Sequence, residues 1–206
     1  MTSDGASRGE RTKTEIVRAA LGLFRDNGYH GTSMRAIARQ AGMAVGGIYN
    51  HFSSKEEIFR SVLLEFHPYK EVIPALREAR GDTLERFVRD AATRMVVGFG
   101  QPVDFLNLVF IELVEFNGKH IPDLFQAIYP QLEEFGQRFM QESQQLRPIP
   151  LPVLLRSFIG LFFSYVMTGL ILSDQMPAEM QDHAFDDFVD IYLHGILNHG
   201  SAPDGS

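Results

Sequence analysis

Side chains suited to covalent or metal chemistry are sparse in this 206-residue chain. It has no Cys, which excludes thiol nucleophiles, disulfides and thiolate zinc sites. It also lacks a phosphate-binding glycine loop, a nucleophile elbow and a Glu–His pair at metallohydrolase spacing. Asp190 and His194 share a helical face, but the next residue on that face is Asn198, a poor ligand. We therefore expect no enzyme, no cofactor and no metal site, and interpret this pair as part of a solvated face.

The chemistry that the sequence does offer is attraction for a polyanion. Residues 1–60 carry nine Lys or Arg and six Asp or Glu, a net charge of +3. The other residues carry ten and twenty, a net charge of −10, and the two parts sum to the chain's −7. A basic amino-terminal part on an acidic body indicates that the first part meets a polyanion such as nucleic acid and the second does not.

The segment TSMRAIARQAGMAVGGIYNHFSSK, residues 32–55, has the pattern of a helix, a tight turn and a second short helix. Gly42 supplies the backbone conformation that such a turn needs. Ala38 is small where the two helices would cross, as is Ala41, and Ile37 and Ile48 would hold the pair against a preceding helix. A short helix presented rigidly in this way fits the major groove of DNA, which is about 12 Å wide. The segment therefore predicts a helix-turn-helix.

The elements that must position this motif are helices throughout, because apolar residues recur at a 3.6-residue spacing and strand-like alternation is almost absent. Three pairs have the spacing of a capping box that begins a helix, namely Thr12 with Glu15, Ser53 with Glu56, and Asp82 with Glu85. We expect helices at about 12–28, 34–40, 44–51, 53–66, 82–95, 104–116, 124–139, 153–172 and 185–197. The predicted fold class is all-α.

In its amino-terminal part the chain resembles the TetR/AcrR family of bacterial transcriptional regulators. The resemblance covers roughly residues 12–60, and its spacing is specific. It is carried by Thr32, Ile37-Ala38, Ala41-Gly42-Met43-Ala44, Gly46, Ile48-Tyr49, His51-Phe52 and Lys55. The runs Phe188-Val189-Asp190 and Leu193-His194-Gly195 also fall where that family places its last, dimerising helix.

The resemblance implies a three-helix DNA-binding head at residues 9–69, with the helix-turn-helix at 32–51. A helical domain for ligand binding and dimerisation would follow at 70–198, and then a flexible tail at 199–206. The implied function is a ligand-responsive regulator, most simply a repressor, that binds a near-palindromic operator as a homodimer and is released by a small-molecule inducer. We expect it in the cytoplasm.

The resemblance also implies which residues of the head touch DNA. A hydroxyl at the start of the second helix would bond a phosphate, the recognition helix would face base edges, and the residues after it would bind the phosphate backbone. Two arginines on the outer face of the second helix are added from their spacing. The expected contacts are Thr32, Ser33, Arg35, Arg39, Ala44, Val45, Gly46, Gly47, Tyr49, Asn50, His51 and Lys55.

Two features depart from the family pattern, the residue at position 44 and the pair Gly46-Gly47. Ala44 replaces the usual Ser, so it offers no side-chain cap, a loss that typically costs about 1 kcal/mol. Gly46 and Gly47 each lower helix propensity by about 0.8–1 kcal/mol relative to Ala. Small side chains would let the helix approach the groove closely, or they would leave it loose until DNA orders it. Readout would then come from thymine methyl groups, Asn50 or DNA shape.

The body is expected to provide the dimer surface and the ligand pocket. Its last two helices present apolar and small residues suited to a dimer, or else to the subunit's own core: Gly160, Ser164, Thr168, Phe185, Phe188, Val189, Tyr192 and Ile196. Candidates for the pocket lining are Arg94, Met95, Phe99, Phe110, Glu112, Phe116, Phe125, Tyr129, Phe162 and Tyr165.

Two glutamates leave an alternative open. Glu112 and Glu115 interrupt the most apolar helix and would receive a cationic ligand, balanced by Arg94. Alternatively they form a solvated strip, with Lys119 paired to Glu115 four residues away.

Two further alternatives concern the protein as a whole. Residues 151–172 are strongly apolar, but Arg156 leaves only seventeen uncharged residues after it, fewer than the roughly 20 that a bilayer requires. We therefore expect no membrane span. The main alternative to a regulator is a helical ligand-binding or scaffold protein whose DNA-binding head is degenerate, an interpretation that only Ala44 and the glycine pair favour.

Overall fold

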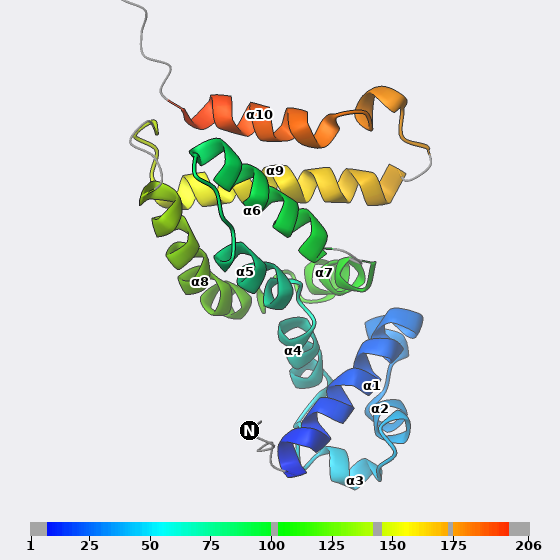
Figure 1. Cartoon of the computed structure of the whole chain (residues 1–206). Coiled ribbons are helices and arrows are strands. Elements are labelled where there is room, and N and C mark those ends of the chain that lie inside the picture. Colours follow the sequence, from blue (N-terminus) through cyan, green and yellow to red (C-terminus); the bar gives the residue numbers. More distant parts are fainter. Residues whose placement is uncertain (1–7, 100–102, 142–145, 173–174, 198–206) are drawn as a thin grey trace, which may run out of the picture. The chain divides into compact units, whose positions relative to one another are not determined.

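The computed structural model describes residues 8–99, 103–141, 146–172 and 175–197. Within these ranges the chain is helical, and the one β-type pairing is an isolated bridge between Leu146 and Leu197 (Figure 1). The all-α prediction is confirmed. The predicted tail at 199–206 lies outside the described residues. The chain divides into two compact units, which we describe separately.

Unit 1 comprises residues 1–67 and 101–126. It contains α1 (Arg8–Gly31), α2 (Met34–Gln40), α3 (Val45–Ile48), α4 (Lys55–Glu65), α7 (Val103–Glu115) and the first residues of α8 (Ile121–Gln141). Its core is a single apolar cluster, made of Ile16, Val17, Ala20, Phe24, Ile37, Ala38, Ile48, Phe52, Ile58, Phe59, Val62, Leu63 and Leu108. Every helix of the predicted head contributes to this core, so the head is packed around one centre.

The helix starts differ from the capping boxes that the sequence suggests. α1 begins before Thr12, whose hydroxyl donates to the carbonyl of Arg8 instead of capping. At α4 the cap is shifted by one residue: Ser54 accepts from the N–H of Glu57, and the Glu57 carboxylate accepts from the N–H of Ser53 at 2.7 Å. At the predicted stop α1 is kinked, since Gly28 has a φ of 69°, but helical residues continue to Gly31.

The segment 101–126 packs with unit 1, whereas the sequence places it in the body at 70–198. Leu108 of α7 is buried in the core of the head. The Glu115 carboxylate bonds the His30 ring at the end of α1, and the Arg60 side chain of α4 donates to Asp123 at 2.6 Å. These contacts join residues far apart in sequence, so the spacing of apolar residues could not reveal them.

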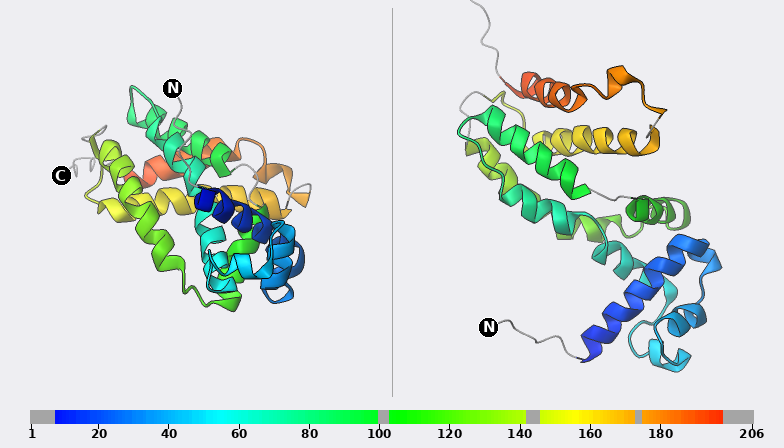
Figure 2. Two further views of the ribbon diagram at one scale, coloured as in Figure 1. Left: turned by 90° about the horizontal axis from the view of Figure 1, so that it is seen from below. Right: turned by 45° about the vertical axis from the view of Figure 1, so that its right-hand side comes forward.

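Unit 2 comprises residues 68–100 and 127–206. It contains α5 (Tyr69–Arg77), α6 (Leu84–Phe99), most of α8, α9 (Leu151–Leu172), a 3-10 turn η2 (Ala178–Met180) and α10 (Ala184–Ile196). α9 and α10 run side by side in all the views (Figure 2). Sequence patterning misses α5, because it is short and contains Pro74. Pro130 lies inside α8, which continues through it.

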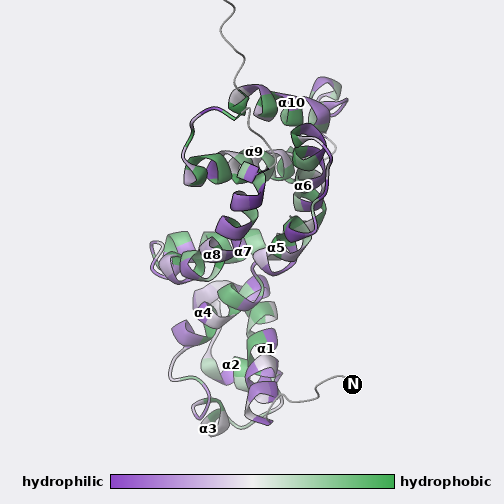
Figure 3. Ribbon diagram, turned by 60° about the vertical axis from the view of Figure 1, so that its left-hand side comes forward, coloured by the Kyte–Doolittle hydropathy of each residue, from purple (hydrophilic) through white to green (hydrophobic). Residues whose placement is uncertain are grey.

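α9 is the most uniformly apolar helix of unit 2 (Figure 3). By length and composition it is long and apolar enough to cross a membrane, a test that the core helix of a soluble protein also passes. Leu154, Phe158 and Phe162 of α9 are almost completely buried against α6, α8 and α10. One side of α9 therefore lies in the core of unit 2, while its other side is exposed.

Gly81 precedes α6 at a place where the chain packs on its own backbone. A Cβ there would lie 2.2 Å from the backbone nitrogen of Phe87, and backbone cannot move aside cheaply. We expect Gly81→Ala to lower the free energy of unfolding by about 1–3 kcal/mol or more, the cost of overpacking.

The matched control is Gly169→Ala in α9, where a Cβ would meet no atom within 4 Å. Because Ala is the better helix former, this change should raise the free energy of unfolding by up to about 1 kcal/mol. Urea unfolding of both variants checks the pair. Equal stability of the two variants would contradict the packing described at Gly81.

Candidate nucleic-acid interface

The turn between α2 and α3 is built from local hydrogen bonds. Ser33 caps α2 by accepting from the N–H of Ala36 at 3.1 Å. Gly42 takes a φ of 68°, which places it in the left-handed region that favours glycine, and the N–H of Met43 then donates to the carbonyl of Ala38. The chain reverses within three residues and starts α3. The predicted turn at Gly42 is confirmed.

α3 is held mainly by burial of one side. Ile48 is completely buried, and Phe52 just after the helix is nearly so; both pack in the same core as Ile37. The ammonium of Lys13 lies over the Phe52 ring, 5.9 Å from its centre. α3 has only four helical residues and its N-cap, Ala44, makes no side-chain hydrogen bond. Its position therefore depends on these core contacts.

The other side of α3 faces outward. Val45 is 38% exposed and Tyr49 53% exposed, and they are the large hydrophobic side chains that the described part of the head, residues 8–67, leaves exposed. Gly46 and Asn50 are exposed as well, and Gly47 and His51 are half-buried. Apolar surface and hydrogen-bonding groups thus gather on one short helix, which is the mixture that base edges in a major groove present.

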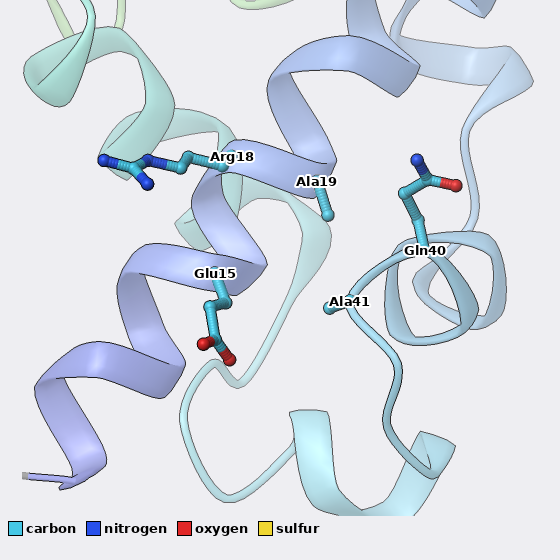
Figure 4. Close-up of a pocket in the computed structure, with 5 residues that line it drawn as sticks. All are labelled: Glu15, Arg18, Ala19, Gln40 and Ala41. Atoms are coloured by element: carbon cyan, nitrogen blue, oxygen red, sulfur yellow. The ribbon is translucent and has the colours of Figure 1, made fainter.

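The charged residues predicted on α2 are also accessible. Arg35 and Arg39 are exposed on the outward side of α2, four residues apart. A shallow hollow lies beside them between α1 and α2, lined by Glu15, Arg18, Ala19, Gln40 and Ala41 (Figure 4). Ala19 and Ala41 face each other across it, so Ala41 lies next to α1, whereas the sequence places it at the crossing of the two motif helices.

Thr32 has a structural role in place of the predicted phosphate contact. It is 2% exposed, and its hydroxyl is placed to donate to the carbonyls of Leu23 and Gly28, at 3.0 and 2.9 Å. These carbonyls lie at the end of α1, so Thr32 satisfies groups that the helix leaves open. Of the two hydroxyls that the sequence offers for the start of α2, Ser33 is the capping one.

Lys55 is likewise engaged inside the chain. Its ammonium donates to the carbonyls of Tyr29 and Thr32, at 2.6 and 2.7 Å, and lies 4.0 Å from the centre of the Tyr29 ring. Burial lowers the pKa of Lys55, and the nearby Glu115 carboxylate opposes that shift. Two of the three N–H donors are thus used within the head, where they tie α4 to the end of α1, and one is left for the predicted phosphate contact.

Glu112 is not part of a solvated strip. It is completely buried, and its carboxylate accepts from the backbone N–H of His120 at 2.7 Å and bonds the ring nitrogen Nδ1 at 2.8 Å. It therefore closes the turn between α7 and α8. Sequence analysis missed His120, for which the one signal was a histidine eight residues beyond a glutamate in an apolar helix.

The other charged partners also differ from the predictions. Lys119 bonds Glu56 of α4 instead of Glu115. The hydrogen bond with Lys119 is the main reason that the pKa of Glu56 is lowered. Arg94 pairs with Asp90 at 2.8 Å and with Glu78 at 3.6 Å, all within unit 2.

The predicted pocket residues are distributed over both compact units. Phe110, Glu112, Phe116 and Phe125 lie in unit 1, and Arg94, Met95, Phe99, Tyr129, Phe162 and Tyr165 lie in unit 2. Met95 and Phe162 are at most 1% exposed and pack in the core of unit 2. For these two residues, the helical spacing of large apolar side chains therefore indicates a position in the core of unit 2.

The predicted dimer residues also separate into two sets. Val189, Tyr192 and Ile196 are buried in the protomer's own core, where the Tyr192 hydroxyl donates to the carbonyl of Leu154 at 3.0 Å. They are not available to a second chain. Gly160 and Ser164 are exposed on α9, whereas Thr168, Phe185 and Phe188 are half-buried.

The different roles of Lys55 and Tyr49 give a test. Lys55→Met keeps most of the side chain but loses two charge-assisted hydrogen bonds, so we expect the free energy of unfolding to fall by about 1–3 kcal/mol. Tyr49→Ala removes an exposed side chain and should change stability by less than about 0.5 kcal/mol. Tyr49→Ala should instead weaken binding to every DNA duplex by roughly tenfold, the value of one hydrogen bond to a phosphate.

Thermal unfolding and a gel-shift titration of both variants check these expectations. A Lys55→Met variant with unchanged stability and much weaker DNA binding would mean that Lys55 contacts phosphate after all.

Comparison with known proteins agrees with this geometry. Residues 16–62 match the profile of the family described as bacterial regulatory proteins, tetR family. The HTH-type transcriptional regulator UidR of Escherichia coli (strain K12) is 34% identical over 65 residues, 32% of this chain and 33% of UidR. The chain thus matches about a third of the length of that relative.

Solved structures match over most of the chain. A structure described as a TetR-family regulator from Mesorhizobium loti MAFF303099 superposes with a TM-score of 0.67, at 25% identity over 93% of this chain and 100% of the other. FadR from Bacillus subtilis in complex with stearoyl-CoA gives 0.64, at 20% identity over 89% and 98%, a likeness of fold alone. With its helix-turn-helix and its matched family profile, the head of the chain is a DNA-binding domain of the tetR family of bacterial regulatory proteins.

Proposed function

We propose that this protein is a ligand-responsive transcriptional regulator, acting as a repressor in the cytoplasm. It binds a near-palindromic operator as a homodimer and leaves it when a small molecule binds. The observation that carries the proposal is the outward side of α3, where Val45 and Tyr49 are exposed while Ile48 is completely buried. A helix held in this way can enter a major groove without rearranging the head.

DNA affinity in this proposal comes from the phosphates and sequence preference from α3. Ser33, Arg35 and Arg39 are exposed at or near α2, and Tyr49 and His51 follow the recognition residues. These groups can bond phosphates on both sides of the groove that α3 enters. We leave Thr32 and Lys55 out of this set because of their structural roles.

Dimerisation is proposed because one head covers only a half-site. The outward residues of α9 repeat at helical spacing and include Gly160, Ser164 and Ile171, the last of which is 74% exposed. On the neighbouring α10, Ile191 is 61% exposed. A Cβ on Gly160 would meet no atom within 4 Å, so there is room for another helix to approach closely. We propose these residues, with Thr168, as the dimer surface.

A charged side chain at this surface should separate the protomers. We expect Ile191→Glu to shift the protein from dimer to monomer and to weaken operator binding at least about tenfold, since two tethered heads bind far better than one. Val97→Glu on α6 is the matched control, because Val97 is 71% exposed but lies on neither α9 nor α10.

Analytical ultracentrifugation and the same gel-shift assay give both quantities. A dimeric Ile191→Glu variant with full operator affinity would place the interface elsewhere.

The inducer is proposed to be mainly apolar and to bind within unit 2. In unit 2 the Phe99 ring contacts that of Phe163, and the Tyr165 ring contacts those of Phe185 and Phe188. The similar fold of FadR was solved with stearoyl-CoA, which supports an apolar ligand for this architecture. A ligand that fits one arrangement of the helices better than another would shift the population and change operator affinity.

The proposal is tested by selecting duplexes from a random-sequence DNA pool with the full-length protein. The expected result is an inverted repeat whose two halves are about one helical turn apart, bound by two protomers with a strong salt dependence. The selected sequence is called the selected duplex below. Recovery of no preferred sequence, with a dimer that still binds apolar ligands, would favour a ligand-binding or scaffold protein instead.

A further inference from the structure

Two glycines of the recognition helix have no structural reason within the chain. A Cβ built on Gly46 or on Gly47 would meet no atom within 4 Å. Neither residue takes a positive φ, whereas Gly28, Gly42 and Gly118 do. Packing and backbone conformation would therefore both accept alanine at these two positions.

The glycines also weaken the helix in which they lie. α3 comprises Val45–Ile48 and has no side-chain cap, so each residue matters to its stability. Glycine costs roughly 0.8–1 kcal/mol relative to alanine inside a helix. An alanine pair would fit and would stabilise α3, so any benefit of two bare positions must lie outside the folded chain.

The surroundings of the pair suggest what that benefit is. Gly46 is exposed and Gly47 half-buried, with exposed Val45 before them and exposed Tyr49 after them. Between these two side chains the surface of α3 is backbone alone. Val45 ends in methyl groups and has no hydrogen-bonding atom in its side chain.

We infer that Gly46 and Gly47 determine sequence specificity by letting the backbone of α3 lie directly against base edges in the major groove, with Val45 on the 5-methyl group of a thymine. This inference rests on the proposed function, because it requires that α3 enter the groove. In this mode of readout, α3 makes van der Waals contact with the major-groove edge of a base that carries a methyl group, which distinguishes thymine from cytosine.

The decisive variant is the full-length protein with Gly46→Ala and Gly47→Ala together. Its melting temperature should be equal to or above that of the parent. Its affinity for the selected duplex should fall about tenfold or more, the usual effect of disturbing one base-pair contact. Its affinity for an unrelated duplex should change by less than about threefold, because that binding depends on phosphates.

Gly22→Ala in α1 is the matched control. A Cβ there would also meet no atom within 4 Å, and Gly22 lies in a helix outside the helix-turn-helix. It should stabilise the protein without changing DNA affinity. If the double variant binds the selected duplex as tightly as the parent or more tightly, the inference is overturned, and the glycines only leave α3 loose.

A second measurement uses the parent protein and chemically altered DNA. Replacing thymines of the selected half-site by deoxyuridine removes the methyl group and leaves the hydrogen-bonding edge intact. One such position should weaken binding by the parent severalfold and by a Val45→Ala variant hardly at all. A half-site without thymine, or equal loss in both proteins, overturns the role of Val45.

These outcomes are distinguishable from failure of the proposed function. If no duplex is selected at all, then the regulator proposal fails first. If the parent binds a selected duplex and the glycine double variant binds it equally well, then the regulator proposal stands and only the reading by bare backbone is rejected.

Discussion

Burial of Ile48 is the contact on which the DNA-binding surface depends. α3 has four helical residues, two of them glycine, and no side-chain cap. It would not form in isolation, because the hydrogen bonds of a single turn do not offset the conformational entropy lost in nucleating a helix. Ile48 is completely buried with Ile37 and Phe52 in the core of the head. Val45 and Tyr49, four residues apart, share one side of the helix, and with Ile48 held in the core they remain 38% and 53% exposed.

The rest of the head supports that contact through ties that are distant in sequence. Lys55 joins the start of α4 to the end of α1 through two backbone carbonyls, and the single hydroxyl of Thr32 lies within hydrogen-bond distance of two others. On another side α7 contributes Leu108 to the core, and the buried pair of Glu112 and His120 closes the turn after it. Several charged and polar residues that resemble binding residues in the sequence thus stabilise the packing of the head. The exposed charged and polar residues are the ones that we propose to contact DNA.

Helices and the motif could be predicted from the sequence because they depend on local spacing. The 3.6-residue period located nearly all helices, and Gly42 marked the turn. Helix starts were displaced by a residue or more, since neighbouring polar residues such as Ser53 and Ser54 both suit a cap. The roles of Thr32, Lys55 and Glu112 could not be predicted, because their partners become neighbours only in the folded chain. The pocket stays a prediction, because the period of apolar residues does not say in which unit an aromatic side chain lies.

The central claim is that the outward side of α3 is the surface that meets DNA. The most direct measurement is an NMR titration of isotopically labelled protein with the selected duplex, following each backbone amide. The account predicts that the largest changes fall at residues 45–51 and at the start of α2, with those of buried α9 positions small. Unchanged amides at 45–51, with the large changes elsewhere, would contradict it.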